Sequence, residues 1–134
     1  MDVYEAINSR RSVRRYQPDA PSVEVIERVL AAAHAAPYGT PQDERYFLVL
    51  GGEAKEKFTS FLEQRINDLM PALQEASPPQ ILILARSVLP TIRSAPVLIL
   101  VYVAQTDSGA LLSLGSVAAA IENLLLAARS EGLG

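Results

Sequence analysis

Apolar residues recur at the three-to-four-residue spacing of an α-helix along most of this chain. The clearest predicted helices cover residues 2–9, 22–36, 53–74 and 111–131. Asp2 and Ser22 stand where helix N-caps are expected, and Gly132 stands where a helix commonly stops. The pattern therefore predicts a largely helical chain whose main helices have recognisable ends.

Two short apolar runs predict strands instead. One covers residues 46–50 and ends at a pair of glycines, and the other covers residues 96–103. The second run is apolar on both faces, so we expect it to lie centrally in a sheet that helices cover. Residues 81–92 fit either element, and their length and the strand that follows favour a helix. Pro71 is expected to kink or end the helix before them.

The predicted helix over residues 111–131 is apolar almost all round. Its apolar positions include Val117, Ala118, Ala119, Ala120, Ile121, Leu124, Leu125, Leu126, Ala127 and Ala128. A helix of this kind is buried on every side, either in a core or across a subunit interface. For so small a domain we favour an interface between two copies. The first predicted helix is simpler, with Val3, Ala6 and Ile7 spaced for one buried face.

Composition narrows the class of protein. The chain has 134 residues, of which 49% are hydrophobic and 20% charged, with a net charge of -3. These values predict one domain with a real core, and the acidic balance argues against general nucleic-acid binding. No run reaches the roughly 18 uninterrupted apolar residues of a membrane span, and the acidic N-terminus lacks a signal core. We expect a soluble cytoplasmic protein.

Side chains for ordinary acid–base, nucleophilic or metal chemistry are scarce in the sequence. The chain has no cysteine and a single histidine, His34, for which a structural or surface role is expected. It shows no nucleophile elbow, no metal-ligand spacing, no phosphate-binding glycine loop and no dinucleotide fingerprint. We therefore predict no catalytic side chain and no metal, and an enzyme of this sequence would rely on a bound cofactor.

A basic cluster near the N-terminus is the clearest candidate for binding chemistry. It reads Arg10, Arg11, Ser12, Val13, Arg14, Arg15 and Tyr16, against an acidic background. Guanidinium groups match phosphate oxygens two at a time, and a serine adds a compact donor and acceptor. The cluster leaves a predicted helix and precedes a turn, where a chain can wrap a phosphate. It predicts a site for a phosphorylated cofactor, and the alternative is a solvated basic loop.

Four blocks of the sequence resemble the flavin mononucleotide (FMN)-dependent nitroreductase family, in the right order and over essentially the whole chain. They are residues 9–16 with the following Pro18-Asp19, residues 26–37, the strand after Ala95-Pro96, and residues 116–134. The last block and residues 95–97 most resemble the branch that contains the flavin domain of the deazaflavin-cofactor glutamate ligase.

The resemblance implies an α+β fold with a central sheet flanked by helices and a long buried helix at a homodimer interface. It also implies FMN at that interface and an oxidoreductase that passes hydride from NAD(P)H to the flavin and then to a nitro, quinone or similar acceptor. Protein acid–base residues are largely dispensable in that scheme. The residues implied in cofactor binding are Arg10, Arg11, Ser12 and Arg14 for the phosphate and ribityl chain, and Pro37, Tyr38 and Gly39 for further flavin contacts.

The loop after Pro37 departs from the family pattern. It reads Tyr38, Pro41, Asp43 and Glu44 where the family usually has a small or hydroxyl residue, an asparagine, and then Gln-Pro. The asparagine amide that hydrogen-bonds the flavin from the partner subunit is therefore absent, since proline has no side-chain donor. Backbone contacts of the loop and stacking by Tyr38 remain expected.

The position of the last residue is a second departure. Gly134 falls where the family continues with another flavin-contacting loop, more helix and at least one more strand. We therefore predict a single nitroreductase-like domain over residues 1–134 that lacks the C-terminal segment, as a fragment or as a reduced variant. The alternatives to a working enzyme are an impaired or non-catalytic flavin-binding homodimer with an incomplete pocket, and a module for another phosphorylated small molecule.

Overall fold

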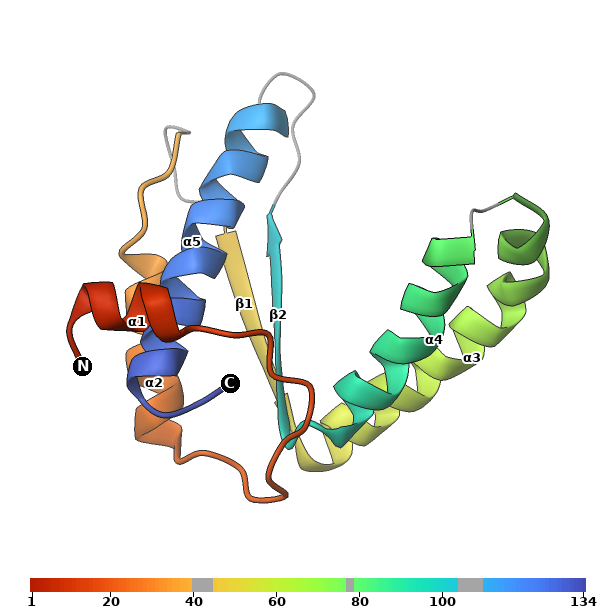
Figure 1. The fold of residues 1–134 in the computed structure, drawn as a ribbon, viewed down its shortest axis with the longest axis horizontal. Helices are drawn as coiled ribbons and strands as arrows, with labels where there is room; N and C mark the ends of the chain where they lie inside the picture. Colours follow the sequence, from red (N-terminus) through yellow and green to blue (C-terminus); the bar gives the residue numbers. More distant parts are fainter. Residues whose placement is uncertain (40–44, 77–78, 104–109) are drawn as a thin grey trace. The chain divides into compact units, whose positions relative to one another are not determined.

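The computed structural model describes residues 1–39, 45–76, 79–103 and 110–134, and Figure 1 shows its helices and strands in chain order. The elements are α1 (Val3–Ser9), α2 (Val23–His34), β1 (Arg45–Gly51), α3 (Gly52–Ala76), α4 (Pro79–Ser94), β2 (Val97–Val103) and α5 (Ala110–Ser130). The predicted α+β class is confirmed, and the segment that fitted either element is the helix α4.

Contacts divide the described chain into two compact units. The first comprises Met1–Val13, Pro21–Leu48 and Ile99–Gly134, and the second comprises Arg14–Ala20 and Val49–Leu98. The first unit therefore holds α1, α2, α5 and the larger part of each strand, while the second holds α3 and α4.

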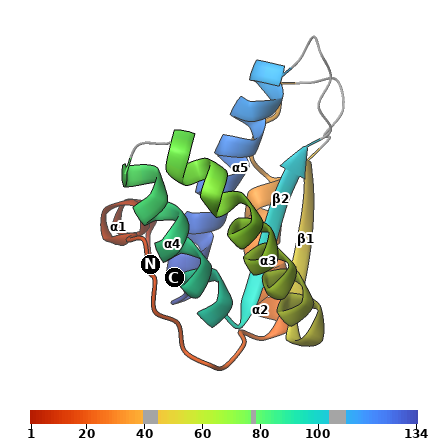
Figure 2. The same cartoon turned by 90° about the vertical axis from the view of Figure 1, so that its right-hand side faces the viewer.

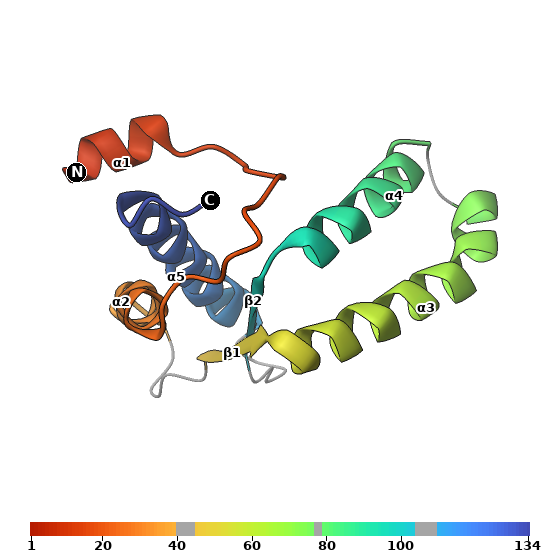
Figure 3. The same ribbon diagram turned by 90° about the horizontal axis from the view of Figure 1, so that it is seen from below.

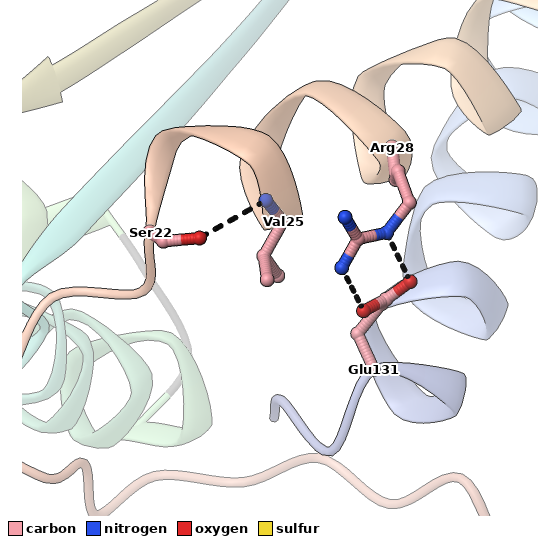
Figure 4. Close-up of polar contacts among 4 residues, drawn as sticks. All are labelled: Ser22, Val25, Arg28 and Glu131. Atoms are coloured by element: carbon pink, nitrogen blue, oxygen red, sulfur yellow. Dashed lines mark hydrogen bonds and ion pairs between the residues drawn. The ribbon is translucent and has the colours of Figure 1, made fainter.

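The predicted N-caps are confirmed. The Asp2 carboxylate accepts a hydrogen bond from the backbone N–H of Glu5 at 2.9 Å and so begins α1. The Ser22 hydroxyl accepts one from the N–H of Val25 at 3.4 Å at the start of α2 (Figure 4). Each bond satisfies a backbone donor that a helix start leaves without a helical partner. Local sequence is therefore sufficient to begin both helices where they are observed.

The C-terminal end of α5 is equally well defined. Gly132 adopts a positive φ of 78°, a conformation that residues with a Cβ rarely take. The N–H of Leu133 then donates to the carbonyl of Ala128 at 2.8 Å. This glycine-based closure is the stop that the sequence predicts for the helix.

In the first unit α5 packs against α1 and α2, as Figure 3 shows from below. The buried apolar side chains of this packing are small or medium in size: Ala6, Val29, Ala33, Ala36 and Ala120. The Asn123 amide of α5 also donates to the carbonyl of Ala32 at 3.1 Å. Small side chains allow the helices to approach closely, and this brings the ends of α2 and α5 within reach of polar contacts.

An ion pair joins α2 to the turn after α5. Arg28 donates from Nε and Nη2 to the two oxygens of Glu131 at 2.8 and 2.7 Å, the forked arrangement seen in Figure 4. The hydrogen bonds from Arg28 lower the pKa of the Glu131 carboxyl, and those to Glu131 raise the pKa of Arg28. Both groups lie at the surface, so solvent screens the pair.

The second unit is built on the helix pair α3 and α4, which lie side by side in Figure 2. Lys55 of α3 is buried and donates to the carbonyl of Arg93 at 3.0 Å. Its ammonium also pairs with Glu56 at 2.8 Å and lowers the pKa of that carboxyl. Pro71 was expected to kink or end this helix, and it does not end it, because α3 continues to Ala76.

Within a single chain α5 is not buried on every side. Of its described side chains only Ser113, Ser116 and Ala120 are buried, whereas Leu111 is 80% and Leu114 64% exposed. The all-round apolar pattern therefore leaves an apolar face uncovered in a single chain. By length and composition alone α5 could cross a membrane, but here it packs on α1 and α2.

The first helix and the sheet are also less covered than expected. In α1 only Ala6 is buried, and Val3 and Ile7 are exposed. The described residues form a two-stranded sheet in which Tyr46 and Tyr102 stack at 5.3 Å. The central position expected for β2 is thus not seen within the described residues, since β1 is its single strand neighbour there.

Candidate functional site

The arginine segment, residues 10–14 of the basic cluster, begins where α1 ends. Arg10 is the C-cap of α1 with an extended backbone, and its N–H still donates to the carbonyl of Ala6. Arg11 then folds back, so that its Nη1 donates to the carbonyl of Asn8 at 2.9 Å and of Arg10 at 2.7 Å. Ser12 follows and is exposed, as Arg11 is. This places two guanidinium groups and a hydroxyl on one short extended stretch at a helix end.

Two contacts hold this segment to the C-terminal half of α5 and the residues that follow it. Arg129 donates from Nε to the Ser9 hydroxyl at 3.0 Å. Gly134 lies so close to Val13 that a Cβ on the glycine would stand 2.5 Å from the valine Cγ2. Ser9 and Val13, on either side of Arg10, Arg11 and Ser12, therefore lie against the end of α5, while Arg11 and Ser12 are exposed to solvent.

Arg14, the fourth residue predicted to bind the phosphate, belongs to the second unit. It is exposed, and so are its neighbours up to Arg15. The first unit thus brings Arg10, Arg11 and Ser12 together, while Arg14 follows them along the chain.

The second predicted segment, residues 37–39, follows α2 and is organised by Arg45. This arginine is only 6% exposed, and its Nη2 donates to the carbonyls of His34 at 3.2 Å and Ala36 at 3.0 Å. Its Nη1 reaches the carbonyl of Ser116 at 3.4 Å. The guanidinium thereby ties the end of α2 to α5 and satisfies carbonyl groups that a helix end leaves open.

The same residues fix the loop that follows. The Arg45 guanidinium lies 5.3 Å from the centre of the Tyr38 ring, a cation–π distance. The N–H of Gly39 donates to the Ser116 hydroxyl at 3.0 Å, and that hydroxyl donates in turn to the carbonyl of Leu112 at 2.8 Å. A loop that looked irregular in sequence is therefore held at both ends by side chains of β1 and α5.

Arg45 is the residue that sequence reasoning missed. It directly precedes the apolar run of β1, and the predicted strand began only at Tyr46, so the pattern gave Arg45 no role. A single charge at the first position of a strand was the available signal. Pro41, Asp43 and Glu44, which depart from the family pattern, lie outside the described residues.

The two predicted flavin-contacting segments lie near opposite ends of α5 (Figure 1). The loop 37–39 contacts α5 at Ser116, whereas the arginine segment is joined to it at Arg129. Thirteen residues separate these contacts, which at 1.5 Å per residue is about 20 Å along the helix axis. Within one chain the two segments are therefore not one compact site.

His34 ends α2 with an exposed side chain, and its carbonyl is an acceptor for Arg45. This agrees with the structural or surface role predicted for it. No group of three His, Asp or Glu residues within the described ranges is placed to hold a metal ion.

Known protein families provide a match to most of this chain. The sequence profile of the Nitroreductase family matches residues 7–134. The chain belongs to the nitroreductase family. This confirms the resemblance drawn from the arginine segment and the later blocks of the sequence.

A curated relative and two solved structures illustrate the relationship. The Escherichia coli (strain K12) protein named "Putative NAD(P)H nitroreductase YdjA" is 36% identical over 64 residues, which are 48% of this chain and 35% of that protein. The crystal structure of a BluB-like flavoprotein from Clostridium difficile 630 has a TM-score of 0.81 and 24% identity over 98% of this chain and 71% of the other. The crystal structure of a nitroreductase with bound FMN from Bacteroides fragilis NCTC 9343 has a TM-score of 0.73 and 26% identity over 98% of this chain and 66% of the other.

These likenesses confirm the predicted nitroreductase-like fold for the described chain. The chain spans about a third of the length of the curated relative and about two thirds of the length of the FMN-bound structure.

Proposed function

We propose that this chain is the flavin-binding part of a homodimeric oxidoreductase that acts in the cytoplasm and uses FMN. Membership of the nitroreductase family and the fold shared with an FMN-bound nitroreductase support the proposal. The observation that carries it is the exposed arginine segment, held in an extended form at the end of α1.

The arginine segment suits a phosphate group. Arg10 and Arg11 supply two permanent positive charges, and Ser12 supplies a hydroxyl on the same extended stretch. Arg11 commits one of its nitrogens to backbone carbonyls, and a guanidinium has five N–H donors in all. We assign the phosphate and ribityl chain to Arg10, Arg11, Ser12 and Arg14.

The second part of the proposed site is the loop of Pro37, Tyr38 and Gly39. Arg45 and Ser116 hold this loop in one conformation, so its backbone is preorganised for a ligand. Tyr38 is half exposed and offers a ring for stacking. We assign flavin contacts to these three loop residues.

The distance between the two segments favours a dimer. About 20 Å along α5 separates the loop from the arginine segment of the same chain. A flavin bound between two copies would meet the arginine segment of one copy and the loop of the other. The exposed apolar face of α5, with Leu111 and Leu114, supplies surface that such an interface would bury.

When bound, FMN would accept hydride from NAD(P)H and pass it to a nitro, quinone or similar acceptor. The residues of this chain would bind and orient the flavin, and none is required to act as a general acid or base. A second candidate is a flavin-binding homodimer with little or no turnover. The loss of the loop asparagine, replaced by Pro41, is the observation that favours it.

Flavin retention tests the proposal. The purified chain is expected to carry FMN, and the double variant Arg10→Ala, Arg14→Ala is expected to lose it, since two of the phosphate-binding charges are removed. Arg65→Ala, in the exposed part of α3, is the matched control and should keep the flavin. Released flavin is measured by fluorescence after denaturation.

A double variant that retains wild-type flavin would overturn the phosphate assignment. A wild-type chain that carries no flavin but binds another phosphorylated molecule would replace FMN with that ligand. With flavin bound, consumption of NADPH in the presence of a nitroaromatic or a quinone separates the enzyme from the non-catalytic alternative.

A further inference from the structure

The end of α5 carries an arginine that the proposed flavin site does not include. Arg129 lies in the last turn of α5 and is half-buried where α1 packs against that helix (Figure 3). Its Nε donates to the Ser9 hydroxyl at 3.0 Å, and the two residues are 120 positions apart in the chain. Ser9 is the last residue of α1, and Arg10 follows it directly. Arg129 therefore contacts the residue from which the arginine segment begins.

The stretch that follows Ser9 forms neither a helix nor a strand. Arg10 already has an extended backbone, and Arg11 and Ser12 after it are exposed. Fixing such a stretch costs conformational entropy, and a ligand that has to fix it on binding loses affinity. A bond that fixes the start of the stretch before the ligand arrives removes part of this cost.

Stabilisation of a helix end is the alternative role for Arg129. A positive charge in the last turn of a helix interacts favourably with the negative end of the helix dipole. That role needs no contact with α1, yet the Arg129 bond goes to the side chain of Ser9 on α1. Because this contact lies within the first unit, which also holds Arg10, Arg11 and Ser12, its effect can reach the arginine segment directly.

We propose that Arg129 is a positioning residue for the flavin phosphate. Through the Ser9 hydroxyl it fixes the start of the arginine segment, so that Arg10, Arg11 and Ser12 are presented in one arrangement before the phosphate binds. This role rests on the proposed flavin function, and it extends the phosphate-binding machinery from the N-terminal segment to the far end of α5.

The affinities of the full chain for FMN and for riboflavin test this role, because riboflavin has the same ring and ribityl chain but no phosphate. Ser9→Ala should weaken FMN binding about fivefold, the value of one net hydrogen bond, and leave riboflavin binding unchanged. The substitution changes no charge, and alanine is the best helix former, so α1 should remain intact. Quenching of flavin fluorescence on binding measures both affinities.

Arg129→Gln should weaken FMN binding at least as much, since it removes the same bond together with a positive charge. Adding Ser9→Ala to Arg129→Gln should cost nothing further, because the two residues share one interaction. A role at the helix end alone predicts a lower melting temperature for Arg129→Gln and an unchanged ratio of the two affinities.

Two variants at the same end of α5 are matched controls. Ser130→Ala removes an exposed hydroxyl from the last residue of α5, and Arg28→Gln breaks the ion pair between α2 and Glu131. Both should keep the wild-type ratio of FMN to riboflavin affinity. Arg28→Gln should lower the melting temperature, which separates the stability of this helix end from phosphate binding.

A measurement on the flavin-free chain tests the anchoring itself. Backbone ¹⁵N order parameters of Arg11 and Ser12 should be near about 0.85 in the wild type, the value of a rigid backbone. In Ser9→Ala and Arg129→Gln they should fall below about 0.6, the range of a flexible backbone. Ser130→Ala should leave them as they are in the wild type.

The outcomes separate this role from the flavin proposal. A wild type that binds FMN no better than riboflavin would overturn the phosphate assignment and this role with it. A wild type that prefers FMN, with the preference undiminished in Ser9→Ala or Arg129→Gln, would overturn the role of Arg129 alone. Unchanged order parameters in both variants, or an equal loss of FMN preference in Arg28→Gln, would do the same and leave the flavin proposal standing.

Discussion

Arg45 illustrates how one buried charge can organise a binding loop. Its guanidinium donates to carbonyls at the end of α2 and on α5 and lies against the ring of Tyr38. The charge is permanent, so every N–H that faces the protein interior needs an acceptor. Backbone carbonyls at a helix end provide them, and this explains why an arginine is stable at a buried position of β1.

Replacing Arg45 with methionine should test this role. Methionine keeps much of the apolar stem but removes the donors, so we expect the free energy of unfolding to fall by about 2–3 kcal/mol. Faster hydrogen exchange at the Gly39 amide should accompany the loss, because the Ser116 contact alone would then hold the loop. Arg65→Met, at an exposed site, is the control, and an equal loss there would contradict the assignment.

The Arg28–Glu131 pair predicts a dependence of stability on pH. Because Arg28 lowers the pKa of Glu131 in the folded chain, the pair stabilises above the pKa of the unfolded carboxyl. That contribution disappears as the pH falls through the lower pKa of the folded state. Glu131→Gln should therefore lower the melting temperature at neutral pH but have little effect in acid below that pKa.

Thermal unfolding of wild type and Glu131→Gln across the acid range measures this difference. Glu27→Gln, at an exposed position of α2, is the matched control and should behave as the wild type at each pH. High salt should also shrink the difference, since both partners lie at the surface. A difference that stays constant with pH would show that the charge of Glu131 is not its cause.

At the scale of elements, the ends of the helices follow local chemistry while their burial does not. The side chains of Asp2 and Ser22 cap α1 and α2 by accepting hydrogen bonds from the backbone N–H three residues further along. Gly132 ends α5 with its positive φ. These interactions involve neighbours in the chain, so sequence alone predicts them. The coverage of α5 depends on what else reaches it, and a single chain leaves one apolar face open.

Replacing each of two glycines by alanine, Gly115 inside α5 and Gly132 just after it, should change the free energy of unfolding in opposite directions. Gly132→Ala should lower the free energy of unfolding by about 1–2 kcal/mol, because a Cβ is disfavoured at a φ of 78°. Gly115→Ala should raise it by about 0.5–1 kcal/mol, since Gly115 lies inside the helix with open space at its Cβ position. Chemical denaturation measures both, and equal signs would contradict the closure described for α5.

For the molecule as a whole, the exposed apolar face of α5 and the separation of the two segments predicted to contact flavin favour self-association. A two-stranded sheet with uncovered strands is also marginal on its own. Leu111→Glu should shift the chain from dimer to monomer and reduce its flavin content, because the proposed site needs both copies. Leu69→Glu, at another exposed apolar position, in α3, should change neither.

Analytical ultracentrifugation measures the oligomeric state of the Leu111→Glu and Leu69→Glu variants, and flavin fluorescence measures their flavin content. A wild-type chain that is monomeric and still retains flavin would overturn the shared site. A monomeric Leu111→Glu variant with undiminished flavin would place the whole flavin site within one chain.

From the sequence alone, periodicity, caps and breakers gave the approximate position of the helices and strands, because they act over a few neighbouring residues. The family and the α+β class came instead from the resemblance of four sequence blocks to known nitroreductases. Only the tertiary structure revealed Arg45 as the support of the loop, since its acceptors are 9, 11 and 71 residues away in the chain. It also separated the two predicted binding segments along α5. These features depend on which distant residues the packing of helices brings together, and no local pattern encodes them.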